Sequence, residues 1–488
     1  MACKCTEDGK GGKDEKPKKF ITLDSINQNI VKAKFLCGAL FERADELQKE
    51  LDEGKTLCFD EIIKANTDDG QSMGQKPITY IRQVVAIATC PTLCCQPNFP
   101  TDAKSQAMAI IRSTTSQSLG SFADFRGISV VRQHIAEYIE DRDGIPANVD
   151  DIFIVSGITS ITDLLASSDK KKGIMIPYPQ FPLHGSTISC SGMEIIKYYL
   201  DECKGWAFDI EEMKKAITEA KNNNIEPCGI LIISPGNPTG QVLTKETIQD
   251  IIKFANEQSL MILADEVYQH NIHDKSLQFL SFKKVMKEMG PPYDQSELCS
   301  FMSISKGWYG ESGFRGGYME LVNADPDVKG VLLKLLANRL ACATPGQAVL
   351  DCIVKPPSKE SESFGQFCSE IQAISSSNAE RAKFVEEQLN CLKGFKCHPI
   401  QGGTYAFPSI CLAKKAVEEA KKRCQEPDFF YASELLKNTG ILVVPGSEFG
   451  QKEGTYHIAI SILPPMDKLK SLFEKFNEFN NDFTSKYW

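Results

Sequence analysis

Six short apolar runs between residues 150 and 320 constrain the fold of this chain more than any other feature. Each run is rich in β-branched residues and ends in a loop of glycine, serine, proline or asparagine. Helical patterns separate several of them, as in residues 245–258, where four apolar residues share one face. Continuous apolar strands that alternate with helices predict an α/β fold, in which a mostly parallel sheet is covered on both faces. The six runs cover residues 151–157, 173–179, 228–240, 260–268, 298–307 and 316–322.

Polar residues gather where these predicted strands end. Asn237 follows the third run, Asp265 and Tyr268 lie at the end of the fourth, and Ser303 and Lys306 at the end of the fifth. In open α/β sheets, ligands bind outside the carboxyl ends of the strands. The sequence therefore predicts a binding site that these five residues share.

The regions on either side of the six runs have a different pattern. Residues 36–54 have helical spacing with Gly54 as a stop, and residues 375–392 and 466–483 are also helical in pattern. Short strand-like segments cover residues 402–410, 440–450 and 454–465. Strands and helices on this scale predict a second, smaller α+β domain.

We predict four regions along the chain. They are a disordered tail at 1–19, an N-terminal arm with part of the small domain at 20–110, a large domain at 111–350, and a small C-terminal domain at 351–488.

Charge and hydropathy exclude several classes of protein. The net charge is −9 and the pI about 5.4, so no basic surface is expected to bind nucleic acid or an anionic membrane. No apolar run approaches the roughly 18–20 residues that a membrane span needs. The first residues contain no apolar segment typical of a secretory signal. We expect a cytoplasmic protein.

Neither cysteine nor histidine forms a convincing metal set. The 18 cysteines are scattered apart from clusters at 3–5 and 90–95, and no histidine stands near either cluster. Reduced thiols are the expected state. His270 and His273 lie three residues apart and are interpreted as loop residues, so no metal is predicted.

The residues at the strand ends have a shared chemistry. Lys306 can form a Schiff base with an aldehyde, and Arg315 lies in a glycine-rich turn that suits a phosphate. Residues 155–165 offer a strand, Gly157 and a helix start, whose N–H groups favour an anion. Asp265 could hold a ring nitrogen protonated. This set describes pyridoxal 5′-phosphate (PLP), although a turn lysine or a capping aspartate would explain each residue taken alone.

The chain resembles the fold-type I PLP-dependent transferases, in their alanine aminotransferase branch. The resemblance runs in order from about residue 25 to the C-terminus, and seven segments together make it highly specific. They are "GQKPITYIRQVVA" (74–86), "IPYPQFPLHGS" (176–186), "SPGNPTGQVL" (234–243), "LADEVYQHNI" (263–272), "SISKGWYGESGFRGGYMELVN" (303–323), "VVPGSEFGQKEGTYH" (443–457) and "ILPP" (462–465).

The resemblance implies roles for residues around the cofactor ring. Lys306 would be the Schiff-base lysine and the base that moves the proton, and Asp265 would pair with the pyridinium nitrogen. Asn237 and Tyr268 would hydrogen-bond the ring hydroxyl, and Phe181 would stack on the ring. As in the family, Lys306, Asp265 and Tyr268 would be the catalytic residues.

The resemblance also implies a phosphate site. Ser303, Arg315 and the backbone of residues 157–159 would hold the phosphate. The family's Gly-Ala-Ser turn is here Gly157, Ile158 and Thr159. The residue types still suit an anion.

Three departures from the family lie toward the substrate and the subunit interface. Ala459 stands where the family has the arginine that binds the substrate α-carboxylate, within "GTYHIAISILPP". Asp68 replaces a glycine whose backbone approaches that carboxylate, and Phe122 replaces a tyrosine that reaches the phosphate from the neighbouring subunit. The nearest basic residues, Lys452 and His457, are expected to flank the strand of Ala459 rather than to share its face.

The sequence thus predicts a PLP-dependent aminotransferase that acts on a small-molecule amine donor and a carbonyl acceptor, as a homodimer. Without the arginine, the substrate is expected to be an amine, aldehyde or ketone that lacks an α-carboxylate, with Asp68, Asn237 and Ala459 as substrate-binding residues. Alternatives are an alanine/2-oxoglutarate transaminase with a substitute cation, a PLP-binding pseudoenzyme, and a PLP-dependent lyase or decarboxylase.

Overall fold

The apolar runs form a seven-stranded sheet in the computed structural model, which describes residues 21–33, 38–166 and 169–488. The strand order is β2-β8-β7-β6-β5-β3-β4, and only β8 runs against the others, so the predicted mostly parallel sheet is confirmed. Its strands are β2 (Ile152–Ile154), β3 (Lys172–Tyr178), β4 (Glu194–Tyr199), β5 (Glu226–Ile233), β6 (Met261–Asp265), β7 (Leu298–Ser303) and β8 (Gly317–Val322).

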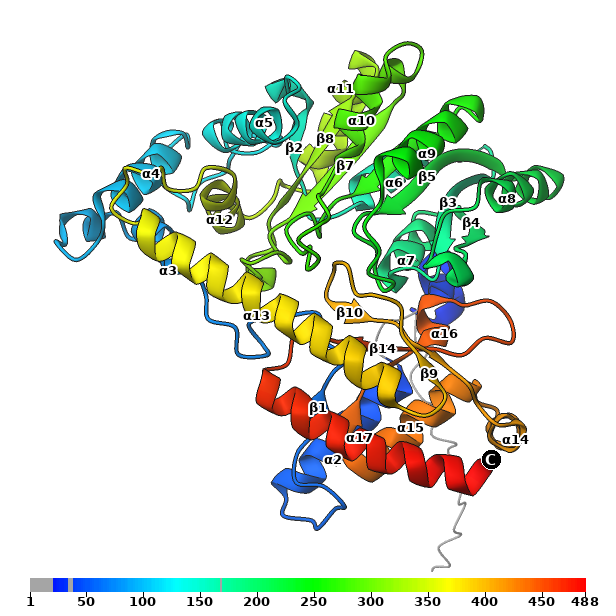
Figure 1. Cartoon of the computed structure of the whole chain (residues 1–488). Helices are drawn as coiled ribbons and strands as arrows, with labels where there is room; N and C mark the ends of the chain where they lie inside the picture. Colours follow the sequence, from blue (N-terminus) through cyan, green and yellow to red (C-terminus); the bar gives the residue numbers. More distant parts are fainter. Residues whose placement is uncertain (1–20, 34–37, 167–168) are drawn as a thin grey trace, which may run out of the picture.

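Helices cover both faces of this sheet (Figure 1). Along β6, Ile262 and Ala264 pack into one cluster with helices α8 to α10, whereas Met261 and Leu263 pack into another with α6, α7 and α11. This alternation explains why a strand buried on both sides is apolar throughout. The helices are α6 (Thr159–Leu165), α7 (Pro182–Cys190), α8 (Ile210–Asn222), α9 (Lys245–Glu257), α10 (Phe282–Met289) and α11 (Pro326–Asn338).

Helix α9 shows how local sequence fixes these elements. The Thr244 hydroxyl accepts a hydrogen bond from the Thr247 N–H at 3.2 Å, which satisfies one free donor of the first turn. Ile248, Ile251 and Ile252 are fully buried against the sheet. The helix therefore begins and faces the core as its sequence predicts.

A further helical layer packs beside β2, β7 and β8. It shares one apolar cluster, in which buried residues of α3 and α4 meet those of α5 and α12. Its helices are α3 (Thr79–Thr89), α4 (Thr101–Arg112), α5 (Ser129–Asp143) and α12 (Thr344–Val354).

The second part of the molecule joins the two ends of the chain. Strand β1 pairs in parallel with β12, and α2 packs beside it, so that the blue and red segments lie together in Figure 1. The elements are α2 (Ala39–Asp52), β1 (Ile63–Lys64), β9 (Phe395–Lys396), β10 (Tyr405–Ala406), β11 (Ser409–Ile410), α14 (Lys414–Lys422), α15 (Pro427–Thr439), β12 (Ile441–Leu442), β13 (Val444–Pro445), α16 (Gly446–Phe449), β14 (Ile458–Ser461) and α17 (Met466–Tyr487). The short α1 (Gln28–Lys32), which precedes them, packs against α7 of the large domain.

Helix α13 (Phe364–Cys391) connects the two parts. Its start buries Phe367 in the cluster of α3 and α12, and its end buries Val385 and Leu389 in the small-domain core. The predicted segment 20–110 contributes to both cores. Its buried residues from Leu40 to Ala65 join the small-domain core, and those from Ile78 to Ile111 join a core of the large domain. The domain boundaries stay a prediction, and this packing supports moving the boundary predicted between residues 110 and 111 toward residue 70.

Several elements differ from the sequence expectation. The helix expected at 375–392 begins at Phe364, and the segment 440–450 holds two short strands and α16 rather than one strand. Strand β4, at the edge of the sheet, was not predicted, because its run "EIIKYY" contains two charged residues and is not a continuous apolar run. The predicted tail at 1–19 and the first residues of the helix predicted at 36–54 lie outside the described residues.

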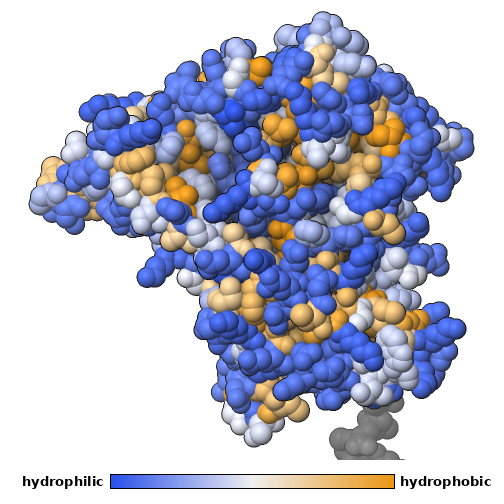
Figure 2. Space-filling view, in the orientation of Figure 1, coloured by the Kyte–Doolittle hydropathy of each residue, from blue (hydrophilic) through white to orange (hydrophobic). Residues whose placement is uncertain are grey.

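The surface and the thiols agree with a globular chain. Hydrophilic residues cover most of the face shown in Figure 2, with smaller hydrophobic patches between them. Within the described ranges no helix is long and apolar enough to cross a membrane, no group of side chains could hold a metal, and every cysteine is free.

Candidate active site

Four of the predicted site residues lie at the carboxyl edge of the sheet. Asp265 is the last residue of β6 and Ser303 the last of β7, while Asn237 and Lys306 lie in the loops that follow β5 and β7. The Asn237 amide donates to the Tyr268 hydroxyl at 2.7 Å. The Lys306 Nζ lies 5.9 Å from the centroid of the Tyr268 ring. Parallel strands thus bring together residues that are up to 70 positions apart in the sequence.

Asp68 lies at the centre of this group. Its carboxylate forms an ion pair with the Lys306 Nζ, which also donates to the Asp68 backbone carbonyl at 2.7 Å. The Tyr268 hydroxyl donates to Asp68 Oδ2 at 2.6 Å, and the Thr404 hydroxyl donates to Oδ1. Asp68 therefore points into the site, at the predicted catalytic lysine.

The two tyrosines beside Asp68 are held neutral. Burial raises the pKa of Tyr268 well above its usual value, and the neighbouring Asp68 carboxylate raises it further. Burial likewise raises the pKa of Tyr405, again with a contribution from Asp68. Tyr405 donates to the Asn66 carbonyl at 2.9 Å, which anchors the segment that carries Asp68.

Asp265 has a different partner. Its Oδ2 lies 3.0 Å from the His184 Nε2, and its Oδ1 accepts the Val267 N–H at 3.2 Å. His184 packs edge-on against Phe181, with ring centroids 5.4 Å apart and an interplanar angle of 88°. Phe181 caps the N-terminus of α7, so its ring and that of His184 are one helical turn apart. Sequence reasoning missed His184, although its i+3 spacing from Phe181 was a usable signal.

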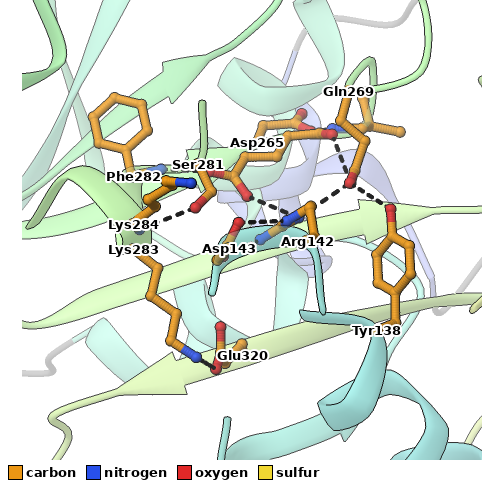
Figure 3. Close-up of polar contacts among 12 residues, drawn as sticks. Tyr138, Arg142, Asp143, Asp265, Gln269, Ser281, Phe282, Lys283, Lys284 and Glu320 are labelled. Atoms are coloured by element: carbon orange, nitrogen blue, oxygen red, sulfur yellow. Dashed lines mark hydrogen bonds and ion pairs between the residues drawn. The ribbon is translucent and has the colours of Figure 1, made fainter. Parts of the chain in front are cut away.

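A buried polar network lies behind Asp265 (Figure 3). The Arg142 guanidinium, from the end of α5, pairs with Asp143 at 2.7 Å, donates to Gln269 Oε1 at 3.0 Å and lies 3.8 Å from Glu266. The Tyr138 hydroxyl donates to the same Gln269 oxygen at 2.9 Å. Because Glu266 and Gln269 flank Tyr268 in sequence, the network fixes the turn that carries Tyr268.

The energetics of that network depend on burial. Burial raises the pKa of Glu266 to about 7, against the opposing effect of Arg142 and of the Phe282 N–H, which donates to Glu266 at 2.9 Å. Nearby, Lys283 and Glu320 form a buried ion pair at 2.5 Å. Sequence analysis did not identify these residues, because a charged side chain usually indicates a solvated position.

The predicted phosphate residues lie on adjacent loops. The Ser156 hydroxyl donates to the Arg315 carbonyl at 3.3 Å, which joins the loop after β2 to the loop before β8. Arg315 has a left-handed backbone (φ 57°), and its exposed guanidinium donates to the Ser312 carbonyl at 2.8 Å. Gly157 also requires a positive φ, 94°, where a side chain would be strained.

Two further observations concern this phosphate region. Ser303 bonds to Ser305 at 3.0 Å rather than to Arg315. The side chain of Phe122, the other residue expected near the phosphate, is 76% exposed, so the rest of its chain covers little of the ring.

Ala459 is fully buried on β14 and faces the large domain. Its neighbours Ile458 and Ile460 pack into the small-domain core, whereas Ala459 packs into the cluster of α8 to α10 and the sheet. In that cluster the segments near it contribute Tyr405, Phe407, Val444 and Phe449. Apolar side chains therefore surround the position that the family's arginine would occupy.

His457 directly precedes β14, as expected of a residue that flanks the strand. Its ring nevertheless stacks on Phe407, which belongs to the same apolar cluster as Ala459, with centroids 4.8 Å apart. It is not a free cation, however, because its ring nitrogens lie 2.8 Å from Gln451 and 3.2 Å from Glu202. It therefore has partners other than a substrate.

The donor set fits PLP. The Asn237 Oδ1 is buried and finds no hydrogen-bond partner among the described residues, and the exposed Arg315 guanidinium has no carboxylate partner there. Lys306 would hold the aldehyde carbon, Asp265 the ring nitrogen, Asn237 and Tyr268 the ring hydroxyl, and Arg315 the phosphate. The carboxyl edge of the sheet thus carries a lysine, a carboxylate and an anion-binding loop, which is the combination that this cofactor requires.

Comparison with known proteins agrees with this fit. The family model for aminotransferase class I and II matches residues 95–475. The chain is 45% identical over 478 residues to human alanine aminotransferase 1, covering 96% of each chain. It is 46% identical to the zebrafish (Danio rerio) alanine aminotransferase 2-like protein, covering 96% of this chain and 87% of that one.

Solved structures show the same fold. The alanine aminotransferase from Pyrococcus furiosus superposes with a TM-score of 0.73 at 21% identity, covering 94% of this chain and all of that chain. An aminotransferase from Escherichia coli gives a TM-score of 0.73 at 22% identity, covering 94% and 98%.

Proposed function

Because the chain belongs to the class I and II aminotransferases and is therefore a PLP-dependent transaminase, we propose that Lys306 is the residue that bonds the cofactor and moves the proton. The observation that carries this proposal is the convergence of Lys306, Asp265, Asn237 and Tyr268 at the carboxyl edge of the sheet. When bound, the cofactor supplies an aldehyde that takes up the amino group and a ring that withdraws electrons from the donor.

The chain's own groups would divide the remaining work. The Lys306 Nζ takes the proton from the donor carbon and returns it to the carbon that accepts it, because it is the amine that lies in the site. Asp265 keeps the ring nitrogen protonated, and His184 orients its carboxylate at 3.0 Å. Tyr268, neutral because it is buried, donates a hydrogen bond.

The phosphate end would anchor the cofactor. Arg315 supplies the positive charge, and the backbone of Gly157, Ile158 and Thr159 together with the Ser303 hydroxyl supply further donors. The support is the bond between Ser156 and the Arg315 carbonyl, which holds the two loops side by side.

We propose that the preferred amine donor lacks an α-carboxylate. Ala459 is surrounded by apolar side chains, and Asp68 places a carboxylate beside Lys306. Losing one partner of a buried charge pair costs about 2–5 kcal/mol, or roughly 30- to several-thousand-fold in affinity. A second carboxylate in the same site adds repulsion.

The relatives' names favour a different donor, since the human and zebrafish proteins are called alanine aminotransferases. An alanine/2-oxoglutarate transaminase is therefore the second candidate. It requires a substitute cation, and His457, the basic residue on the face of Ala459, is already bonded to Glu202 and Gln451.

We propose a cytoplasmic homodimer whose subunits share their active sites. The exposure of Phe122 supports the dimer, because a 76% exposed phenylalanine is free to meet a neighbouring subunit. A PLP-binding pseudoenzyme is less well supported, since a scaffold has no need for Lys306, Asp265, Asn237 and Tyr268 together.

The test begins with cofactor binding. Purified protein reconstituted with PLP should absorb visible light, and Lys306→Ala should abolish that absorbance. A colourless wild type would contradict both the transaminase and the pseudoenzyme.

A single-turnover screen then decides the substrate. Alanine, other amino acids and simple amines are each mixed with the reconstituted protein, and loss of the visible band is followed. Faster conversion by amines supports the proposal. Conversion by alanine at ordinary transaminase rates would refute it, and retention of the band with every donor would favour the pseudoenzyme.

A further inference from the structure

The Lys306 amine has an anionic partner built into the chain. The Asp68 carboxylate contacts the Nζ as an ion pair, and the Nζ also donates to the Asp68 carbonyl at 2.7 Å. Asp68 lies 238 positions before Lys306 in the sequence, so only the tertiary fold brings the two groups into contact.

The carboxylate is fixed in that position from both sides. The Tyr268 hydroxyl donates to Oδ2 at 2.6 Å and the Thr404 hydroxyl donates to Oδ1. Both donors are buried, and only 10% of the Asp68 side chain and 17% of the Lys306 side chain are exposed. Little water can therefore screen the pair, and its attraction is stronger than that of a surface ion pair.

The other ionisable groups around Lys306 do not compete with Asp68. Burial raises the pKa values of Tyr268 and Tyr405, so both stay neutral at physiological pH. Asp265 faces His184, at 3.0 Å. Asp69 turns away from the amine and accepts hydrogen bonds from the N–H groups of Gln71 and Ser72.

Two arginines of this region also have partners other than Asp68. The Arg315 guanidinium is exposed and donates to Ser312, and Arg82 pairs with Glu311 at 3.0 Å. Among the described residues, Asp68 is thus the anion in contact with the Nζ.

We propose that Asp68 is a further catalytic residue, which acts as the internal counter-ion of Lys306 and keeps the nitrogen protonated while it links the chain to the cofactor. This inference rests on the proposed function, because it concerns the same lysine. No bond to Asp68 forms or breaks, and the proton stays on the nitrogen. The protonated linkage is the more electrophilic form and therefore the one that an incoming amine attacks.

The same arrangement defines the substrate class more narrowly. Asp68 supplies a negative charge beside the reacting nitrogen, so the donor need not bring a carboxylate of its own. A primary amine with a neutral or cationic substituent would complement this charge. An α-carboxylate would instead place two anions around one nitrogen.

The experiment measures absorbance against pH in PLP-reconstituted protein without substrate, since the protonated linkage absorbs at longer wavelength. Asp68→Asn keeps the size of the side chain and one of the two oxygens that accept hydrogen bonds from Tyr268 and Thr404, but it removes the charge. The midpoint of the spectral change should fall by about 1–3 pH units in this variant, which is the usual effect of losing an adjacent opposite charge. Asp68→Glu should keep much of the wild-type midpoint.

Asp69→Asn is the matched control, because it removes a charge from the neighbouring residue that does not contact Lys306. Its midpoint should equal that of the wild type. Coinciding midpoints in wild type and Asp68→Asn would overturn the inference, and so would an equal fall in Asp69→Asn. Failure of the proposed function is distinguishable, because the wild type would then show no visible band at all.

Discussion

The two sides of the candidate site differ in how far they keep the residues of a transaminase. On the cofactor side, Lys306, Asp265 and Asn237 lie at or just after strand ends of the large sheet. A buried network supports the turn that follows Asp265 (Figure 3). On the substrate side, the small-domain strand carries Ala459, and the segment before α3 carries Asp68. The choice of substrate thus depends largely on parts of the chain outside the sheet, although Asp68 also contacts the cofactor lysine.

The difference follows from what each side must hold fixed. The cofactor is the same in every member of the family, so its partners are built on rigid strand ends and buried charges. The substrate side is made of short strands and a loop, in which one residue can change without disturbing the sheet. Ala459 is buried yet tolerated, since it packs among apolar neighbours.

The largest expected effect comes from a variant in which the substrate side regains the two family residues that it lacks. Compared at a pH where the cofactor linkage is protonated in both proteins, combining Ala459→Arg with Asp68→Gly should raise the rate with alanine by roughly 30- to several-thousand-fold, because it restores a buried charge pair with the substrate. Single-turnover decay of the visible band measures this rate. Since Ala459 is fully buried among apolar side chains, the arginine should also lower stability, by about 1–3 kcal/mol for its packing and further for its desolvated charge.

Ala459→Met with Asp68→Gly is the matched control for that experiment. Methionine is long but uncharged, so it carries a similar packing cost without a cation. An equal gain with alanine in this control would show that Asp68 alone excludes the carboxylate.

A second prediction concerns the buried network of the cofactor side. Glu266 has its pKa raised from 4.5 to about 7 in the folded chain, so the folded state binds more protons than the unfolded state between these values. Raising the pH through this window therefore lowers the free energy of unfolding, by up to about 3 kcal/mol. Glu266→Gln should remove this part of the pH dependence.

Denaturant unfolding of the wild type and of Glu266→Gln between pH 4.5 and 7.5 measures the effect of Glu266 on the free energy of unfolding. The difference between the two proteins is compared, so that the contributions of Glu320 and other groups largely cancel. Exposed Glu257 provides a control, since Glu257→Gln should leave the pH dependence unchanged. Parallel curves for wild type and Glu266→Gln would mean that Glu266 stays ionised beside Arg142.

The smallest expected effect concerns a contact between residue 122 of one subunit and the cofactor phosphate in the neighbouring subunit of the proposed dimer. Phe122→Tyr should tighten PLP binding by about 2- to 10-fold, the net value of one ordinary hydrogen bond. Equilibrium titration of the apoprotein with PLP measures it. Phe125→Tyr, at a residue that is 40% exposed on the same loop, should have no effect, and a similar gain there would argue against a specific phosphate contact by residue 122.

Much of the cofactor side could be predicted from the sequence, because each of its residues follows an apolar strand. Asp265 ends a run of buried residues and Lys306 follows another, and parallel strands must bring such ends together. The network of Arg142 and Glu266 could not be predicted in this way. Its members look like ordinary helix or turn charges until the fold buries them.

The substrate side was predictable only in part. The sequence identified Ala459 and Asp68 as departures from the family and His457 as a residue that flanks the strand, but it did not show that the His457 ring packs on Phe407, in the cluster of Ala459. Strand β14 begins at Ile458, so the direction of each side chain depends on a register that periodicity over so few residues cannot fix.

The sequence by itself therefore determined the α/β sheet and a candidate cofactor site, because strand periodicity and strand-end residues are local properties, while the resemblance of seven segments identified the family. Only the tertiary structure decided that Asp68 contacts the Lys306 amine. A charge acts over a few ångströms in space, and no local pattern relates two residues separated by 238 positions.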